Sequence, residues 1–414
     1  MNLIKICTAF GLFVLGATIN AAPFISGNLG LNGTVASDPS SSSYDPTFAL
    51  DGYLSGQLNF SSNLILNADI SINTSDVSSS GLFGDKIATF RMDSLSATYI
   101  LPAYGKIHSL NVFTGRVHAI GKEEFLQQQF GIKPFYSLMT DDWFGVNGVN
   151  IQRIYGNGFS YTIKPASLPI ALAFLAYKNK DNEDDTEPTL DLKFGTVTKY
   201  FSAELMMGAG IPFKSEDPNG NKVFLYIDSI NLHSAADILI GSSYGSSLLI
   251  QFGFENMIVK AASIDEFPSA DDIFILTELR MREGGTQVCM GVFNIPGEKS
   301  TDETTGDTIY TVSNMPFIED TFGANLTIMN DRLHFFDYDM TFGVHGTFSV
   351  PNMHFTDIPN FNDYKSDANF KVSPFMDVKI FGGVVKVLGQ INVLDLQDDK
   401  GKAIKFSVGY KTSF

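Results

Sequence analysis

The 414-residue sequence predicts an all-β fold: a transmembrane, antiparallel, up-and-down β-barrel of about 18 strands, or 16 if one weak pair of segments is a loop. Three observations lead to this prediction. Apolar and polar residues alternate along most of the chain, tight turns alternate with long polar connections, and no apolar run after residue 21 approaches the ~18 residues of a membrane-spanning helix. Successive side chains of a strand point to opposite faces, so each alternating segment has one apolar and one polar face.

The composition narrows the functional classes. Charged residues make up 18% of the chain, below the roughly 25% of an average globular domain. The mean hydropathy of +0.06 fits a chain whose apolar and polar residues alternate. A net charge of −17 argues against nucleic acid as a partner, because binding to nucleic acid needs a basic surface.

Motifs that carry catalytic or metal chemistry are weak in this sequence. The few histidines are scattered, which predicts no metal site. His345 has no serine motif beside it, and no glycine-rich phosphate loop precedes a helix. The acidic stretches Asp181–Glu187 and Glu298–Asp307 lack the ordered spacing of a calcium loop. We therefore predict no enzymatic activity and no cofactor.

The first 21 residues have the pattern of a cleaved signal peptide. Lys5 gives the N-terminal region its positive charge, and Ile6–Gly16 is the short hydrophobic region that follows. Ala21 is a small residue at the expected cleavage point. The apolar run is too short to span a bilayer of about 30 Å. Cys7 leaves with the peptide, so Cys289 has no intramolecular disulfide partner. Residues 22–414 are then expected to form a single barrel domain, without room for an N-terminal plug.

The first half of the mature chain is predicted to form consecutive hairpins. Ser61–Asn63 and Pro102–Gly105 are short turns between alternating segments. The alternation changes phase after Asp93, which predicts a β-bulge there. The predicted strands of this half are Ile25–Val35, Phe48–Phe60, Leu64–Ile72, Ile87–Leu101, Ile107–Val117, Gly158–Ile163, Leu168–Ala176, Leu190–Gly195 and Phe201–Ile211.

The second half repeats this organisation, with one ambiguous stretch. Val223–Gly245 reads as one long strand with an irregularity near His233–Ser234, or as two short strands; the first reading keeps the alternation of short and long connections and gives 18 strands. Asn330–Asp331 and Gly382–Gly383 are predicted turns. The other predicted strands are Leu248–Glu255, Ile273–Arg282, Gln287–Val292, Phe322–Ile328, Asp337–Phe348, Phe370–Ile380, Val385–Val393 and Lys402–Phe414. A soluble sandwich or solenoid is the alternative, but it would need continuous apolar strands to fill its core.

The last strand carries a family resemblance. Phe406, Val408, Tyr410, Thr412 and Phe414 share the apolar face, and the chain ends on an aromatic residue. This resembles the closing strand of bacterial outer-membrane β-barrels of the porin type. The resemblance implies that Phe414, Tyr410 and Val408 form the signal read by the barrel-assembly machinery. It also implies export through the inner membrane, insertion among outer-membrane lipids, and chain ends in the periplasm.

The residues on the polar face of each predicted strand are expected to line the pore. A barrel of 16 to 18 strands is wide enough for an aqueous channel. The charged residues that we expect to line it are Asp51, Asp69, Arg91, Asp93, Asp191, Lys193, Glu204, Glu255, Glu278, Arg280, Arg282, Asp337, Asp339, Lys371, Asp377, Lys379, Lys405 and Lys411. For any one of these charges, neutralisation by a neighbour across the strand ladder is the favoured explanation over a role in selecting solutes.

Residues 118–150 form the third long connection, within which Glu123–Phe130 is a predicted short helix. In porins resembling this chain, the third long loop folds inward and narrows the pore, and acids on it face a basic wall. By that resemblance the constriction would carry Glu123, Glu124, Asp141 and Asp142. Arg280, Arg282, Lys371 and Lys379 would face them.

The predicted function is an outer-membrane porin, a passive diffusion channel for small hydrophilic solutes or ions. The resemblance implies a homotrimer. One alternative is a surface-exposed adhesin or receptor that uses its long extracellular loops. Another is a substrate-specific outer-membrane transporter, including one for hydrophobic compounds, although such barrels carry an N-terminal plug.

Overall fold

A computed structural model describes most of the chain, and the predicted signal peptide lies outside the described residues. These are residues 23–37, 46–74, 77, 88–121, 123–135, 137–139, 151–179, 187–217, 219–227, 229–242, 244–260, 263–266, 269, 272–301, 308–311, 320–335, 338–394 and 404–414.

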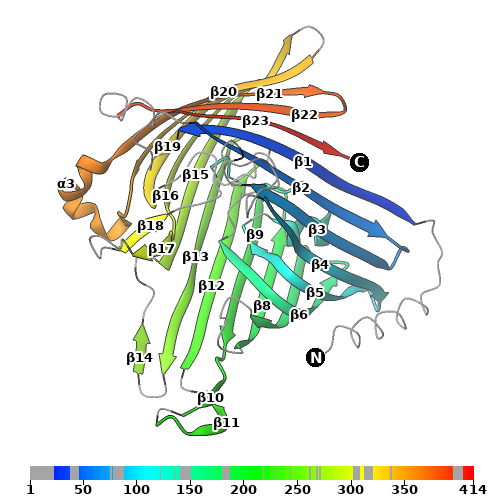
Figure 1. Ribbon diagram of the computed structural model, residues 1–414. Helices are drawn as coiled ribbons and strands as arrows, with labels where there is room; N and C mark the ends of the chain where they lie inside the picture. The colour runs from blue at the N-terminus through cyan, green and yellow to red at the C-terminus, as the bar shows by residue number, and fades with distance from the viewer. Residues whose placement is uncertain are drawn as a thin grey trace.

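The dominant structure is one closed antiparallel barrel (Figure 1). Neighbouring strands pair along the chain, and β23 pairs with β1 from Asn28–Ser413 to Ala36–Lys405, which closes the wall. The wall has 18 strands, the predicted number. They are β1 (Phe24–Ser37), β2 (Pro46–Asn59), β3 (Leu64–Thr74), β4 (Ala88–Ala103), β5 (Lys106–Ile120), β6 (Gln152–Pro165), β7 (Ile170–Asn179), β8 (Glu187–Val197), β9 (Phe201–Gly210), β12 (Ser229–Gly241), β13 (Ser247–Lys260), β15 (Ile273–Glu283), β16 (Thr286–Asn294), β19 (Phe322–Phe335), β20 (Tyr338–Val350), β21 (Asn369–Ile380), β22 (Gly383–Asn392) and β23 (Ile404–Ser413).

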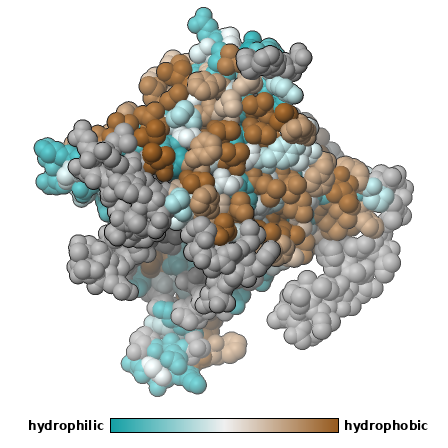
Figure 2. Space-filling model, turned by 45° about the horizontal axis from the view of Figure 1, so that its top comes forward, coloured by the Kyte–Doolittle hydropathy of each residue, from teal (hydrophilic) through white to brown (hydrophobic). Residues whose placement is uncertain are grey.

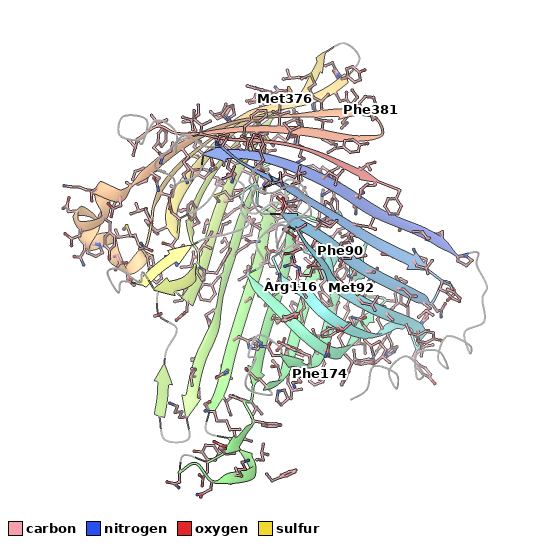
Figure 3. The ribbon with its side chains drawn as sticks, viewed as in Figure 1. Phe90, Met92, Arg116, Phe174, Met376 and Phe381 are labelled. Atoms are coloured by element: carbon pink, nitrogen blue, oxygen red, sulfur yellow. The ribbon has the colours of Figure 1, made fainter. Side chains whose placement is uncertain are left out.

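Burial in the wall is the reverse of burial in a soluble sheet. In β8, Leu190 and Leu192 are 51% and 50% exposed, whereas Asp191 and Lys193 are 1% and 6% exposed. The outer surface is therefore largely apolar, as Figure 2 shows in brown, and Figure 3 marks Phe90, Met92 and Phe174 among its exposed side chains. A wall that closes on itself satisfies its backbone hydrogen bonds and is able to present an apolar outer face to lipid.

The two ends of the barrel differ in their connections. One end carries short turns, such as Phe60–Asn63, Tyr104–Gly105 and Phe381–Gly382. The other end carries the long connections. Their regular parts are α2 (Glu124–Phe130), the hairpin of β10 (Lys214–Glu216) and β11 (Lys222–Tyr226), β14 (Ser263–Glu266), the pair β17 (Glu298–Thr301) and β18 (Thr308–Thr311), and a helical run of η2 (Phe355–Asn360), α3 (Phe361–Tyr364) and η3 (Lys365–Asp367). Among the described residues, no helix is both long and apolar enough to cross a membrane.

Irregular points in the wall confirm one local prediction and correct another. The register of β3 and β4 shifts opposite Asp93, where the sequence pattern predicts a bulge. Asn330–Asp331 was expected to be a turn, but β19 continues through a register shift there and ends at Phe335. Polar residues at a bulge and at a turn give the same sequence signal, because both interrupt the alternation.

The ambiguous stretch Val223–Gly245 is only partly a wall strand. β12 begins at Ser229, and a register shift against β13 lies between Leu232 and Ser234, near the predicted irregularity. Residues 222–226 belong instead to β11, which pairs with β10 in a hairpin that projects from the barrel (Figure 1, bottom). Val223 to Tyr226 is a run of β-branched, aliphatic and aromatic residues, which favours a strand but does not say whether that strand belongs to the wall.

Candidate functional site

The lumen of the barrel is the candidate site, and part of it is filled by the connection between β5 and β6. Phe125 and Leu126 of α2, with Phe135 and Met139 further along, are buried inside the wall. They pack with inward side chains of the wall that include Ala171, Leu175, Met206, Leu249, Leu276 and Phe293. We call the inner faces of β7, β8, β9, β12, β13, β15 and β16 the packed sector.

Glycines of the packed sector provide room for this connection. A Cβ atom at Gly195 would lie 2.7 Å from Cδ2 of Leu126 and 2.8 Å from Cε1 of Phe125. At Gly291 and Gly253 it would overlap Met139 and Ile151. In each case the missing side chain leaves a socket in the inner wall that an apolar side chain of the connection occupies.

Two carboxylates anchor the same connection. Glu278 of β15 accepts hydrogen bonds from Oγ of Ser137 at 2.7 Å and from the backbone N–H of Leu138 at 3.1 Å. Its second oxygen pairs with Arg280, whose guanidinium lies 4.2 Å from the centre of the Phe135 ring. The two oxygens of Glu123 accept from Oγ of Ser202 on β9 at 2.9 Å and from the backbone N–H of Phe135 at 2.5 Å.

Burial of Glu123 changes its acidity. The side chain is enclosed between α2 and the wall, and desolvation raises the pKa of the Glu123 carboxyl to about 7. The hydrogen bonds from Phe135 and Ser202 oppose this rise, and the nearby Glu204 adds to it. Glu123 thus gains or loses its charge in the physiological pH range.

The inner wall around the junction of β23 and β1 is different. We call the inner faces of β22, β23 and β1 to β4 the seam sector. Its polar side chains are mostly half-buried or exposed, and they include Asn32, Asp51, Gln57, Asp69, Lys405 and Lys411. Nζ of Lys411 lies 5.9 Å from the centre of the Tyr53 ring. This part of the lumen combines both signs of charge with neutral polar side chains, and its charged side chains are only half-buried.

The predicted pore-lining residues lie in both sectors and on β20 and β21, which separate the two sectors. Glu278 and Arg280 are buried under the connection, and Arg282 pairs with Asp331. Arg91 pairs with Asp93 beside the β4 bulge. Lys371 is buried on β21, and Lys405 is half-buried on β23. Asp337, Asp141 and Asp142 lie outside the described residues, and Glu124 is half-buried in the first turn of α2.

Two predicted charges lie near the short-turn rim. Asp339 pairs with Nζ of Lys379 at 3.3 Å and with His334 at 2.8 Å. Asp377 pairs with Lys386 at 3.6 Å. The basic wall expected opposite the connection is not one cluster, because β15 with Arg280 and Arg282 is separated in the wall from β21 with Lys371 and Lys379 by β16, β19 and β20.

The residues predicted as an assembly signal lie on the outer face of β23 at the seam. Val408 and Phe414 are exposed there. The backbone of Phe414 exchanges two hydrogen bonds of 3.0 Å with Gly27, and its ring covers the space that a Gly27 side chain would fill. The Tyr410 hydroxyl donates to the carbonyl of Phe381 at 2.7 Å.

The packed sector also holds Asp191, Lys193 and Glu204 of the predicted pore lining, and His233 and Asp237, which are absent from it. Glu204 pairs with Lys193, and His233 lies 2.8 Å from Asp191. Asp237 accepts from Gln251 at 3.0 Å. Strand parity signals Asp191, Lys193 and Glu204, but His233 and Asp237 fall within the ambiguous stretch. No three His, Cys, Asp or Glu side chains in the described ranges are arranged to hold a metal ion.

Comparisons with known proteins add structural neighbours only. No family model matches the chain, and no curated protein matches it. A solved structure of a multiply substituted mutant of the Rh. blastica porin is 9% identical, with a TM-score of 0.41 over 95% of this chain and 100% of that chain. Salmonella typhi OmpF in complex with daunomycin is 11% identical, with a TM-score of 0.44 over 95% of this chain and 97% of that chain.

The fold class therefore follows from the wall itself. Its strands are antiparallel and closed, its outer face is apolar, its inner face is polar, and its short and long connections lie at opposite ends. These properties together are the requirements for a barrel that spans a membrane around a polar interior. The chain is a closed 18-stranded antiparallel β-barrel with an apolar outer face and a polar inner face.

Proposed function

We propose that this barrel is a passive channel for small hydrophilic solutes or ions in the outer membrane. The observation that carries the proposal is the seam sector, where the charged side chains Asp51, Asp69, Lys405 and Lys411 are only half-buried. Such a lining lets hydrated solutes exchange water for wall hydrogen bonds without binding tightly. The neighbouring packed sector narrows the remaining passage.

The connection between β5 and β6 would set the size limit of this channel. Its support is the set of contacts that hold residues 123–139 against the inner wall, including the Glu278 anchor and the Gly195 socket. Glu123 and Glu124 would then act at the base of the constriction rather than as free charges in the passage. The seam-sector lysines and aspartates would contact passing solutes.

Single-channel recording in planar bilayers tests the channel. The purified full chain should give stepwise currents whose size scales with salt concentration, because bulk ions carry the current. The reversal potential in a salt gradient gives the charge preference. Absence of current from correctly folded barrel would rule out the channel.

We also propose that the barrel lies in the outer membrane and is inserted there by the barrel-assembly machinery. The apolar outer face suits contact with lipid, and the outward residues of β23 suit recognition by the barrel-assembly machinery. We also propose a homotrimer. Fractionation of cells and the mass of the detergent-solubilised complex test these two points.

A receptor or adhesin role is the second candidate, favoured by the β10–β11 hairpin. The hairpin projects beyond the barrel end, and Phe224 on it is fully exposed. An exposed aromatic on a projecting hairpin is suited to a protein partner. Removal of residues 214–226 should abolish such binding and leave conductance unchanged.

A further inference from the structure

The connection between β20 and β21 forms a run of short helices at the long-connection end of the barrel (Figure 1, orange). Every third residue from the start of this run is aromatic or aliphatic: Phe355, Ile358, Phe361 and Tyr364. Residues three apart lie one above the other in a 3₁₀ helix and on the same face of an α-helix. These four side chains therefore follow one line along η2 and α3, which we call the helical stripe.

The helical stripe adjoins the apolar outer face of the wall. The ring of Phe361 lies 6.4 Å from the ring of Phe348 on β20, measured between their centres. Phe348 is paired in register with Phe370 of β21, and both rings belong to the outer face, where each is 39% exposed. Ile358 and Phe361 are themselves 53% and 36% exposed. The stripe therefore extends the apolar outer surface past the ends of these two strands.

The rest of the run presents a mainly polar surface. Apart from Pro359, its exposed residues outside the stripe are Thr356, Asn360, Asn362, Asp363, Lys365, Ser366 and Asp367. A helical segment with one apolar stripe and an otherwise polar surface is typical of segments that lie in the plane of a membrane interface. Tyr364 ends the stripe with a ring that carries a hydroxyl group, and such side chains are enriched at the level of lipid headgroups.

Hydrogen bonds to neighbouring parts of the barrel hold both ends of the run. At the start, the backbone N–H of Phe355 donates to Oδ1 of Asn294, the last residue of β16, at 3.0 Å. At the end, Nδ2 of Asn369 donates to Oδ2 of Asp320 at 2.8 Å. The stripe is thus ordered before it meets a partner, which removes the entropic cost of ordering it on binding.

Two properties of the helical stripe favour a lipid surface over a protein as its partner. The stripe is continuous with the outer face of the wall, which is apolar enough to contact lipid. Its exposed apolar part consists mainly of Ile358 and Phe361, with polar residues on either side. A stable protein interface buries about 800 Å² on each partner, which is more than two side chains supply.

We propose that residues 355–367 are an interfacial anchor, in which Ile358 and Phe361 insert between the headgroups and the acyl chains of the surrounding bilayer. Asn362 and Asp363 face the water above. The anchor fixes the depth at which the long-connection end of the barrel lies in its leaflet. This inference goes beyond the channel function and rests on the proposed placement of the wall in a membrane.

Quenching of tryptophan fluorescence by brominated lipids tests the anchor. The chain has a single tryptophan, so Trp143→Phe provides a background without tryptophan emission. Phe361→Trp, Asn362→Trp and Leu192→Trp are made in this background in the full chain. Each variant is reconstituted in phosphatidylcholine vesicles that carry bromine either near the headgroups or deep in the acyl chains. Leu192, an outward residue in the middle of β8, reports on the wall, and Asn362 reports on the polar side of the run.

The expected result is a different depth for each position. Phe361→Trp should lose about half of its emission with shallow bromine and less with deep bromine, because interfacial segments insert only ~5–10 Å. Leu192→Trp should show the reverse order, and Asn362→Trp should lose little with either lipid. Quenching at Phe361→Trp that does not exceed quenching at Asn362→Trp, with Leu192→Trp quenched, would overturn the anchor alone. No quenching at Leu192→Trp would overturn the membrane placement and the anchor with it.

Dilution in lipid distinguishes the anchor from contact with a second copy of the chain. If another copy covered the stripe, quenching at Phe361→Trp would rise as the protein is diluted, and that result would overturn the anchor. Quenching that is independent of dilution would support lipid as the partner. Ile358→Trp replaces Phe361→Trp if the latter does not fold, as judged by gel migration with and without heating.

Discussion

The packed sector and the seam sector face the same lumen, yet their polar residues have different environments. In the packed sector, Asp191, Lys193, Glu204 and Glu278 are almost fully buried and are held by partners within the protein. In the seam sector, Asp51, Asp69, Lys405 and Lys411 remain accessible. Both sets lie on the polar, lumen-facing side of their strands. The difference comes from what covers them, not from the strands that carry them.

This contrast assigns different roles to similar side chains. A buried ion pair is costly to break, because removing one partner leaves an uncompensated charge. An accessible pair such as Asp339–Lys379 contributes little to stability, because water screens it. The packed sector therefore holds the internal connection in place, whereas the charged side chains of the seam sector stay partly accessible to water. The predictions below test this division, in order of decreasing effect.

Removing the internal connection should have the largest effect. Replacing residues 121–150 with a short glycine-serine linker empties the packed sector, while the strand ladder that forms the wall stays intact. Single-channel conductance should increase several-fold. The matched control replaces residues 214–226 with the same linker and should leave the conductance unchanged. Equal conductance in the two variants would mean that the connection does not narrow the passage.

Removing the positive charge of Lys193 in the packed sector should destabilise the protein strongly. Lys193→Met keeps the contact with Phe125 but leaves Glu204 without its ion-pair partner. The free energy of unfolding should fall by about 3–5 kcal/mol, measured by urea denaturation in detergent or lipid. Lys199→Met, at an exposed turn, serves as the control and should change stability by less than about 0.5 kcal/mol. A small loss at Lys193 would argue against a tightly packed sector.

Filling a socket should displace the connection at moderate cost. Gly195→Leu places atoms where Leu126 and Phe125 now lie. Overpacking of this kind costs about 1–3 kcal/mol, and conductance should become noisy as the segment leaves the wall. Gly389→Leu is the control, because its nearest neighbour, Cγ of Pro374, is 3.9 Å from the added Cβ. The interpretation fails if both variants behave alike.

Charge reversal in the seam sector should change selectivity with little effect on stability. Lys405→Glu adds negative charge to an accessible part of the lumen beside Asp51. The reversal potential in a salt gradient should move toward cation preference, and the free energy of unfolding should change by less than about 1 kcal/mol. Lys199→Glu, outside the lumen, should leave the reversal potential unchanged. No shift for Lys405→Glu would exclude the seam sector from the ion path.

Much of the fold was predictable because its rule is local. A strand with one lipid face and one lumen face repeats every two residues, so the wall strands and the bulge beside Asp93 can be read from short segments. Errors arose where two structures give the same short pattern. Val223–Tyr226 has strand-forming residues but belongs to the projecting hairpin and not to the wall. Asn330–Asp331 has turn residues but lies in a bulge of β19.

The sequence by itself determined the barrel class, the strand number and the faces of most strands. It also singled out residues 118–150 as the exceptional connection. Only the tertiary structure decided that Ser137 donates to Glu278, a residue 141 positions away, and that Glu204 lies opposite Asp237. Alternation fixes which way a side chain points relative to its own strand. It carries no information about which distant segment fills the space in front of that side chain, because that depends on strand pairing and packing across the closed wall.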